Sequence, residues 1–182
     1  MERGLIHIYC GDGKGKTSAA TGLSIRAAGR GLSVLFARFL KNDDSGELRI
    51  LETVPEIRLI NPGKSYGFYR TLTDEERKEM HQVYGCFWEQ IRGEISGGEY
   101  DMLVMDEFMA AYRYGLIPKD EAISFLEEKP ETLEVVLTGR DPGEELIRLA
   151  DYVSEIRKKK HPFDRGICLL YTSPSPRDTE RS

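Results

Sequence analysis

The chain has 182 residues, of which 40% are hydrophobic and 31% are charged, and this is the composition of one soluble globular domain. The net charge of −5 argues against a nucleic-acid partner, because such a partner requires a concentrated basic face. No apolar run approaches the roughly 18–20 residues that cross a bilayer, so we expect no membrane partner. The three cysteines are scattered, which indicates a reducing cytoplasm rather than a disulfide framework.

Strand and helix signals alternate along the chain. Short runs rich in apolar residues predict strands at residues 5–10, 32–40, 57–60, 102–106, 133–138 and 152–156. Segments rich in helix formers, one of them opened by a capping box at Thr73–Glu76, predict helices at residues 16–29, 47–53, 73–95, 118–129 and 144–150. Repeated strand–helix units with nearly continuous apolar strands predict an α/β fold: a mostly parallel sheet with helices on both faces.

The end of the chain differs from the rest. Residues 168–182 have no hydrophobic periodicity and contain two Ser-Pro steps, which is typical of a disordered segment. Residues 168–178 can also be back-translated into a string that resembles a transposase adapter used in sequencing libraries. We therefore expect a single nucleotide-binding domain at residues 1–167, followed by a non-native tail that is adapter read-through.

The strongest motif lies between the first strand and the first helix. Its glycines allow backbone N–H groups to approach phosphate oxygens, and the helix that follows favours an anion at its N-terminus. A lysine at its end supplies charge to the outer phosphates, and the next hydroxyl can bind Mg²⁺. The alternative is a glycine-rich turn that merely precedes a helix. The predicted phosphate-binding residues are Gly11, Asp12, Gly13, Lys14, Gly15, Lys16, Thr17 and Ser18.

Two further motifs follow buried strands. Asp106 and Glu107 end the strand at 102–106, and acids at the carboxyl end of a parallel strand lie where open α/β sheets bind ligands and metals. Arg140 follows the strand at 133–138 and can reach phosphate or ribose at the same edge. The alternatives are solvated acids at a strand end and a surface arginine after a turn.

These motifs together resemble the P-loop type of corrinoid adenosyltransferase, also called cob(I)alamin adenosyltransferase. The resemblance runs from about Gly4 to Ile167. It rests on the order and spacing of six segments, at residues 11–22, 39–41, 98–107, 137–140, 150–155 and 160–164.

The resemblance implies a RecA-like P-loop fold and a specific reaction. The 5′-deoxyadenosyl group of ATP would pass to the Co(I) centre of a reduced corrinoid, in cobalamin biosynthesis or salvage, and triphosphate would leave. It further implies Mg²⁺ or Mn²⁺, a nucleotide reversed in the loop relative to ordinary P-loop proteins, a homodimer, and a flavoprotein reductase as partner.

The resemblance also assigns roles to residues. Lys14 and Lys16 would neutralise the triphosphate, and Thr17 and Glu107 would hold the metal with Asp106 nearby. Lys14, Lys16 and Glu107 are thus the expected catalytic residues, and Arg140 joins the nucleotide site. Candidates for an apolar cover over the corrinoid are Tyr66, Phe68, Tyr69 and Trp88.

Two other functions fit parts of the sequence. The loop and the acids alone would suit a P-loop ATPase or kinase equally well. A nucleotide-gated module that binds a corrinoid without transforming it is the non-enzymatic alternative. The products formed from ATP separate these classes.

The tail yields a stability prediction. Deleting residues 168–182 is expected to leave the thermal midpoint nearly unchanged, because the segment has no periodic apolar face to bury. Thermal unfolding of the two forms measures this, and a clear drop on deletion would show that the tail packs against the domain.

Overall fold

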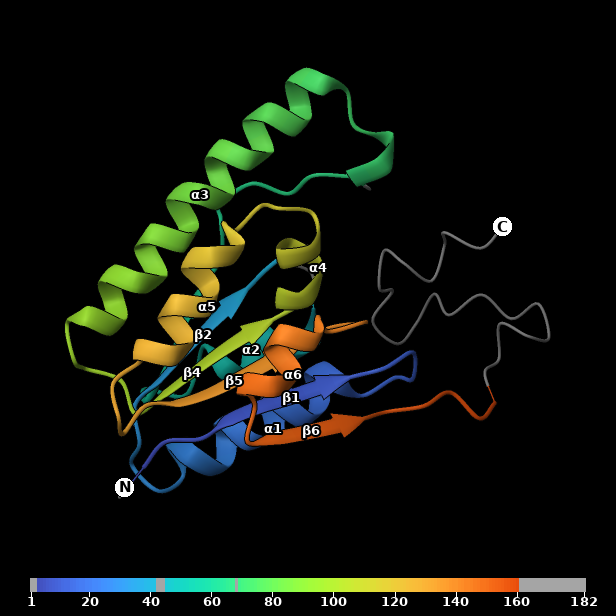
Figure 1. Cartoon of the computed structure of the whole chain (residues 1–182). Coiled ribbons are helices and arrows are strands. Elements are labelled where there is room, and N and C mark those ends of the chain that lie inside the picture. The colour runs from blue at the N-terminus through green and yellow to red at the C-terminus, as the bar shows by residue number, and fades with distance from the viewer. Residues whose placement is uncertain (1–2, 42–44, 68, 161–182) are drawn as a thin grey trace.

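A computed structural model describes residues 3–41, 45–67 and 69–160 of the chain (Figure 1). The tail at 168–182, residues 161–164 and Phe68 lie outside the described residues. The strands are β1 (Ile6–Cys10), β2 (Val34–Arg38), β3 (Ile57–Ile60), β4 (Met102–Asp106), β5 (Glu134–Thr138) and β6 (Tyr152–Glu155). The helices are α1 (Lys16–Ala28), α2 (Gly46–Leu51), α3 (Asp74–Ser96), α4 (Phe108–Arg113), α5 (Lys119–Glu128) and α6 (Glu144–Leu149), with a 3₁₀ turn η1 (Tyr69–Thr71).

The strands form one sheet in the order β3-β2-β4-β5-β1-β6, and every neighbouring pair is parallel. This confirms the predicted α/β class and the parallel, RecA-like sheet that the resemblance implies. The register aligns Arg38 with Asp106 and Tyr9 with Thr138. The carboxyl ends of the strands therefore meet at one edge, where the predicted motifs lie.

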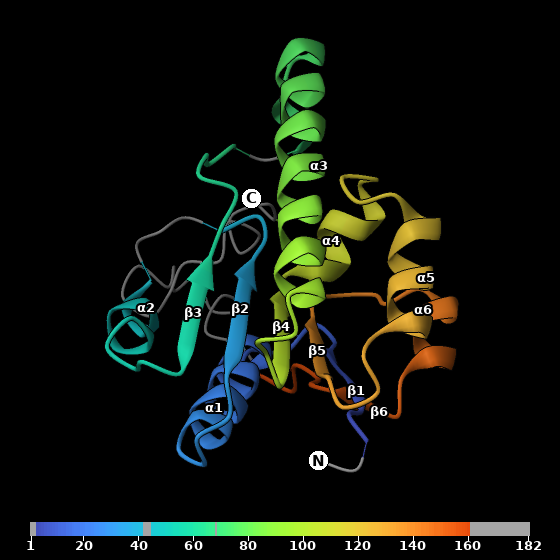
Figure 2. The same ribbon diagram turned by 90° about the vertical axis from the view of Figure 1, so that its left-hand side faces the viewer.

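Helices cover both faces of the sheet, as Figures 1 and 2 show. On one face, strand residues such as Phe36 and Val104 pack with Ala20 of α1 and Leu51 of α2. The hydrophobic core on the other face is larger, and there the strand residues pack with side chains of α3, α4, α5 and α6. Because successive strand residues point to opposite faces, the continuous apolar strands supply both cores at once.

The structure adds two elements to those expected from sequence. Helix α4 begins directly after β4, and its residues 108–112 are all buried, so they show no amphipathic period that would predict a helix. Glu107, which precedes α4, has a φ of 61°, and this turns the chain sharply at the strand end. The second addition is η1, which contains no buried residue.

Helix α3 begins at the predicted capping box and extends well beyond the sheet (Figures 1 and 2). The Thr73 hydroxyl accepts from the Glu76 N–H at 3.2 Å, and the Glu76 carboxylate accepts from the Thr73 N–H at 2.8 Å. The buried residues of α3 include Trp88 and Ile91. Across residues 3–41, 45–67 and 69–160, none of the helices is both long and apolar enough for a membrane span.

The segment after β6 supports the loop after β1. The Gly13 N–H donates to the Ile156 carbonyl at 2.7 Å, and a Cβ at Gly13 would lie 2.7 Å from that same oxygen. A Cβ at Gly11 would lie 2.4 Å from it. Two of the loop glycines are therefore required by the close approach of another backbone segment, in addition to any approach of phosphate.

This contact predicts that one substitution has opposite effects at two glycines. Gly13→Ala is expected to lower the free energy of unfolding by about 1–3 kcal/mol, because the added methyl group overpacks the contact with Ile156. Gly22→Ala is the matched control. It lies within α1 with nothing within 4 Å of its Cβ, so its helix propensity should raise stability by about 1 kcal/mol.

Urea unfolding of the two variants and the wild-type chain measures both effects. A Gly13→Ala variant as stable as Gly22→Ala would show that the loop does not depend on the Ile156 contact.

Candidate active site at the carboxyl edge of the sheet

The predicted phosphate-binding loop joins β1 to the N-terminus of α1. Gly15 caps the helix with a φ of 113°, a left-handed conformation that favours glycine. The Lys16 ammonium folds over the loop and donates to the carbonyls of Gly11 at 2.9 Å and Gly13 at 2.7 Å. The Lys16 residue is only 9% exposed. The loop therefore combines a helix N-terminus and a shielded cation, the two features that favour a bound anion.

Asp106 lies at the centre of the site and is fully buried. Its Oδ1 accepts from the Thr17 hydroxyl at 3.0 Å and from the Thr138 hydroxyl at 2.6 Å. Its Oδ2 accepts from the Lys41 ammonium at 2.5 Å, and that ammonium also lies 2.6 Å from Thr17 Oγ1. Residues from α1, β5 and the end of β2 thus converge on one carboxylate, as a buried charge requires.

The oxygen donors of Thr17 and Asp106 fit a hard divalent cation. A hydroxyl and a carboxylate lie within hydrogen-bond distance beside the phosphate-binding loop. Within the described part of the chain, no group of three or more His, Cys, Asp and Glu side chains could hold a metal ion. Such a pair suits Mg²⁺, which proteins commonly bind through one or two carboxylates together with substrate phosphates.

Glu107 is the residue predicted to hold the metal together with Thr17. It follows Asp106 in the left-handed conformation already noted, and its N–H donates to the Thr138 hydroxyl at 2.9 Å. Its Oε2 atom is buried. Of the two predicted acids, Asp106 is the one that accepts a hydrogen bond from Thr17. Glu107 lies beside it, and its role as a ligand stays a prediction.

The remaining predicted residues lie on and around the loop. Lys14 and Ser18 are exposed, and Arg140 is half-buried. Asp12 accepts from the Lys158 N–H at 2.9 Å. That hydrogen bond, with smaller contributions from nearby positive groups that include Arg140, lowers the pKa of Asp12, so its carboxylate is charged at neutral pH. Because the loop itself carries this negative charge, its attraction for an anion depends on the surrounding cations.

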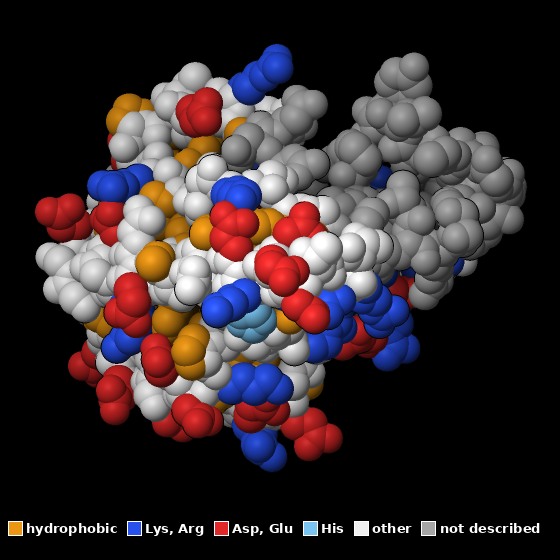
Figure 3. Space-filling view, turned by 90° about the horizontal axis from the view of Figure 1, so that it is seen from above, with side chains coloured by type: hydrophobic (Ala, Val, Ile, Leu, Met, Phe, Trp, Pro, Cys, Tyr) orange, Lys and Arg blue, Asp and Glu red, His pale blue; other side chains and the backbone are white. Residues whose placement is uncertain are grey.

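A basic segment adjoins the loop on one side. Residues 157–160 are Arg-Lys-Lys-Lys, and three of the four are exposed. Seen from above, Lys and Arg side chains gather on one flank of the molecule (Figure 3). Because the Lys158 N–H donates to the Asp12 carboxylate, this segment lies beside the loop. It therefore brings positive charge to the loop, although the protein as a whole is acidic.

Cys10 precedes the loop and is buried. Burial and the nearby negative charge of Glu155 raise the pKa of its thiol. The thiol therefore stays protonated at neutral pH and is a poor nucleophile.

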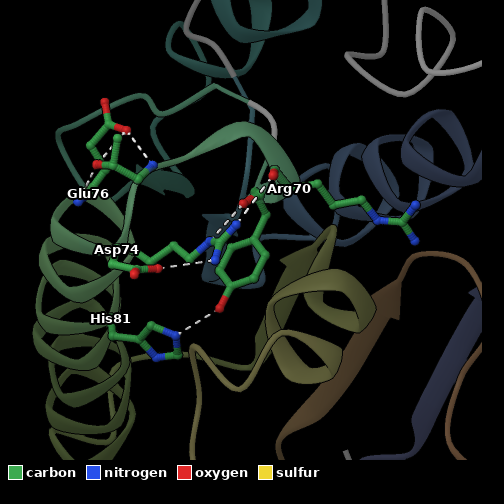
Figure 4. A network of polar contacts seen from close by, with 7 residues as sticks. Arg70, Asp74, Glu76 and His81 are labelled. Carbon is green, nitrogen blue, oxygen red and sulfur yellow. Dashed lines mark hydrogen bonds and ion pairs between the residues drawn. The ribbon is translucent and has the colours of Figure 1, made fainter.

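The aromatic residues suggested as a corrinoid cover separate into different environments. Tyr69 stacks on Tyr114, with ring centroids 4.3 Å apart, and its hydroxyl lies 3.1 Å from His81 Nε2. Figure 4 shows the polar contacts around His81 and the start of α3, from which the Arg70 side chain extends away. Tyr66 is half-buried against the core. The suggestion for Trp88 is wrong: its side chain is 1% exposed in the core, and its indole N–H donates to Glu121 at 3.2 Å.

Three residues of the site were missed by the site prediction. Lys41 and Thr138 contact Asp106 directly, and Arg38 is a buried cation aligned with Asp106 in the sheet. All three lie at or just beyond the carboxyl end of β2 or β5. Their position after apolar runs is the signal that could have identified them, because parallel strand ends meet at one edge.

Comparison with known proteins assigns the chain to a family. The profile described as ATP:corrinoid adenosyltransferase BtuR/CobO/CobP matches residues 2–169, which is most of the chain. The chain belongs to the ATP:corrinoid adenosyltransferase family. This membership confirms the resemblance that the sequence motifs carry.

Curated relatives agree with this family. The Escherichia coli K12 protein named corrinoid adenosyltransferase is 33% identical over 170 residues, covering 91% of this chain and 83% of that protein. The Salmonella typhimurium protein named corrinoid adenosyltransferase CobA is 34% identical, with the same coverage. A Sinorhizobium protein named corrinoid adenosyltransferase is 34% identical, covering 91% of this chain and 78% of that protein.

Among solved structures, EssC (ATPases 2 and 3) from Geobacillus thermodenitrificans is similar at 16% identity and a TM-score of 0.49. The match covers 95% of this chain but only 36% of that one. A likeness at this level supports no functional conclusion.

The position of Lys16 predicts a large effect on turnover with a small effect on stability. Lys16→Ala is expected to lower turnover about 100- to 1000-fold, as the loss of a single electrostatic stabiliser does. The two hydrogen bonds described for its ammonium go to loop carbonyls, so the thermal midpoint should change much less than the turnover. Steady-state rates and thermal unfolding measure the two effects, and activity within about tenfold of wild type would contradict the phosphate role of Lys16.

Proposed function

We propose that this protein transfers the 5′-deoxyadenosyl group of ATP to the Co(I) centre of a reduced corrinoid and releases triphosphate. The observation that carries the proposal is the family match over residues 2–169. Relatives named corrinoid adenosyltransferases, 33–34% identical to this chain, support it. The phosphate-binding loop and the Asp106 cluster are consistent with it, since they form one polar site at the edge of the sheet.

The reaction makes two demands on the protein. The electron pair of Co(I) attacks the 5′ carbon, the bond from that carbon to oxygen breaks, and its electron pair leaves on the triphosphate. Cobalt is formally oxidised to Co(III) in the new cobalt–carbon bond. Because Co(I) is already a strong nucleophile, the protein must align cobalt with carbon and stabilise the charge that develops on the leaving group.

The loop residues meet the second demand in this proposal. The backbone N–H groups of residues 11–18 hold the triphosphate, and Lys14 and Lys16 neutralise it. Lys16 exchanges the Gly11 and Gly13 carbonyls for phosphate oxygens, which are better partners because they carry negative charge. Arg140 contacts phosphate or ribose from the end of β5. Burial strengthens the contribution of Lys16 in particular, because this residue is only 9% exposed and charges interact more strongly where water is excluded.

A divalent metal is a further part of the proposal. Thr17 and Asp106 would hold Mg²⁺ or Mn²⁺ together with phosphate oxygens, and Glu107 lies next to them. When bound, the metal supplies additional positive charge at the leaving triphosphate. Thr138 keeps Asp106 in place from the neighbouring strand.

The family resemblance further suggests how the protein works in the cell. We propose a homodimer, a flavoprotein reductase that supplies reduced corrinoid, and a cytoplasmic location that suits reduced cobalt. Size measurement in solution tests the first of these proposals.

The products of ATP distinguish this function from its alternatives. With ATP and a Co(I) corrinoid, we expect tripolyphosphate and a light-sensitive cobalt–carbon product in equal amounts, because attack at the 5′ carbon releases all three phosphates together. Phosphorus NMR and the absorption spectrum of the corrinoid measure the two products.

Other outcomes would assign the protein elsewhere. ADP as the main product, formed without corrinoid, would favour an ATPase or kinase, in which attack occurs at the γ-phosphorus. A corrinoid that binds in the presence of ATP but keeps its Co(I) spectrum would favour a binding module.

A further inference from the structure

Lys41 reaches the Asp106 cluster because its backbone is held in an unusual conformation. The preceding residue, Leu40, has a φ of 49°, which is rare for a branched side chain and persists only where the surroundings enforce it. Two contacts do so here. The Phe39 N–H donates to the Asp106 carbonyl at 2.9 Å, and the Leu40 N–H donates to the Tyr84 hydroxyl of α3 at 3.0 Å.

The Tyr84 hydroxyl accepts the Leu40 N–H from a side chain that is buried in the core. Burial raises the pKa of Tyr84 to about 12, so it stays neutral at physiological pH. Tyr84 is itself only 2% exposed. A core side chain therefore fixes the turn that directs Lys41 into the site.

The Lys41 ammonium occupies the two oxygens that would hold the metal. It lies 2.5 Å from Asp106 Oδ2 and 2.6 Å from Thr17 Oγ1, and its side chain is only 15% exposed. A divalent cation bound to the same oxygens would lie within a few ångströms of the ammonium. Two positive charges that close in a shielded site repel strongly, so the ammonium and the metal exclude each other.

We propose that Lys41 is a resident cation that takes the place of the metal until the nucleotide arrives. With no nucleotide bound, it neutralises Asp106, holds the Thr17 hydroxyl and keeps free metal ions out. When metal and triphosphate enter together, the ammonium moves from Asp106 to a phosphate oxygen, and the metal takes its place. Lys41 is thus a positioning residue that makes the binding of metal depend on the binding of nucleotide.

This inference rests on the proposed function only in its use of a triphosphate with a divalent metal. It does not involve the corrinoid. The experiments below therefore use no corrinoid and no turnover, so their failure is distinguishable from failure of the adenosyl transfer.

The first experiment titrates Mn²⁺ into the nucleotide-free protein and follows free Mn²⁺ by electron paramagnetic resonance. Lys41→Met is expected to bind Mn²⁺ at least about tenfold more tightly than the wild-type chain, because the competing charge is gone. Lys41→Arg is the matched control, which keeps the positive charge and should bind Mn²⁺ as weakly as wild type. Equal Mn²⁺ affinity in wild type and Lys41→Met would overturn the proposal.

Stability measurements keep the test valid if Lys41→Met folds poorly. That variant leaves the buried Asp106 carboxylate without its cation, so its thermal midpoint should fall and then rise on addition of Mn²⁺ more than that of wild type. The double variant Lys41→Met/Asp106→Asn removes both charges. It should recover the thermal midpoint without metal and show no Mn²⁺ binding, whereas tight Mn²⁺ binding by the double variant would contradict a site at Asp106.

The second experiment tests the transfer to phosphate. Tripolyphosphate without a divalent metal is titrated calorimetrically into Asp106→Asn and into the double variant Lys41→Met/Asp106→Asn, so that metal binding does not contribute. Loss of a charge-assisted contact should weaken binding to the double variant by about tenfold or more, and Lys41→Arg/Asp106→Asn should stay closer to Asp106→Asn. Equal tripolyphosphate affinity in Asp106→Asn and Lys41→Met/Asp106→Asn would overturn the transfer of Lys41 to the nucleotide.

Discussion

A fully buried carboxylate organises the site of this protein. Removing the charge of Asp106 from water costs several kcal/mol unless hydrogen bonds and an opposite charge compensate it. Thr17, Thr138 and Lys41 supply that compensation from α1, β5 and the end of β2. The same contacts fix the relative positions of the phosphate-binding loop and two strand ends. The polar groups of the site are therefore held in place by the chain's own side chains, and such preorganisation is the condition for electrostatic catalysis.

The loop depends on a second structural constraint, the close packing of backbone against backbone. The segment after β6 passes so near to Gly11 and Gly13 that a side chain at either position would collide with Ile156. β6 is an edge strand whose residues are all exposed, so its contribution lies less in the core than in this contact. The first and last described strands thus shape the loop together, and the basic residues 157–160 follow directly.

Basic side chains gather around the loop although the protein as a whole is acidic, which favours a strongly negative ligand. The chain carries a net charge of −5, yet lysines and arginines lie around the loop, and Lys41 contacts the two oxygens that we propose as metal ligands. A triphosphate that gains charge as it leaves is the ligand that such an arrangement favours. In our proposal Lys41 makes metal binding depend on nucleotide binding, because the metal can reach Asp106 only when the ammonium moves to phosphate oxygens.

The sequence by itself determined the fold class and the family, and it located the loop that we predict to bind phosphate. Each of these depends on local patterns: the alternation of apolar runs and helix formers, and short motifs such as the one at residues 11–18. Only the tertiary structure decided which residues meet. Lys41, Thr138 and Asp106 are far apart along the chain, and they converge because β2, β4 and β5 are adjacent and parallel in the sheet. The tertiary structure also decided that Trp88 lies in the core, because its burial depends on which face of α3 packs against the sheet.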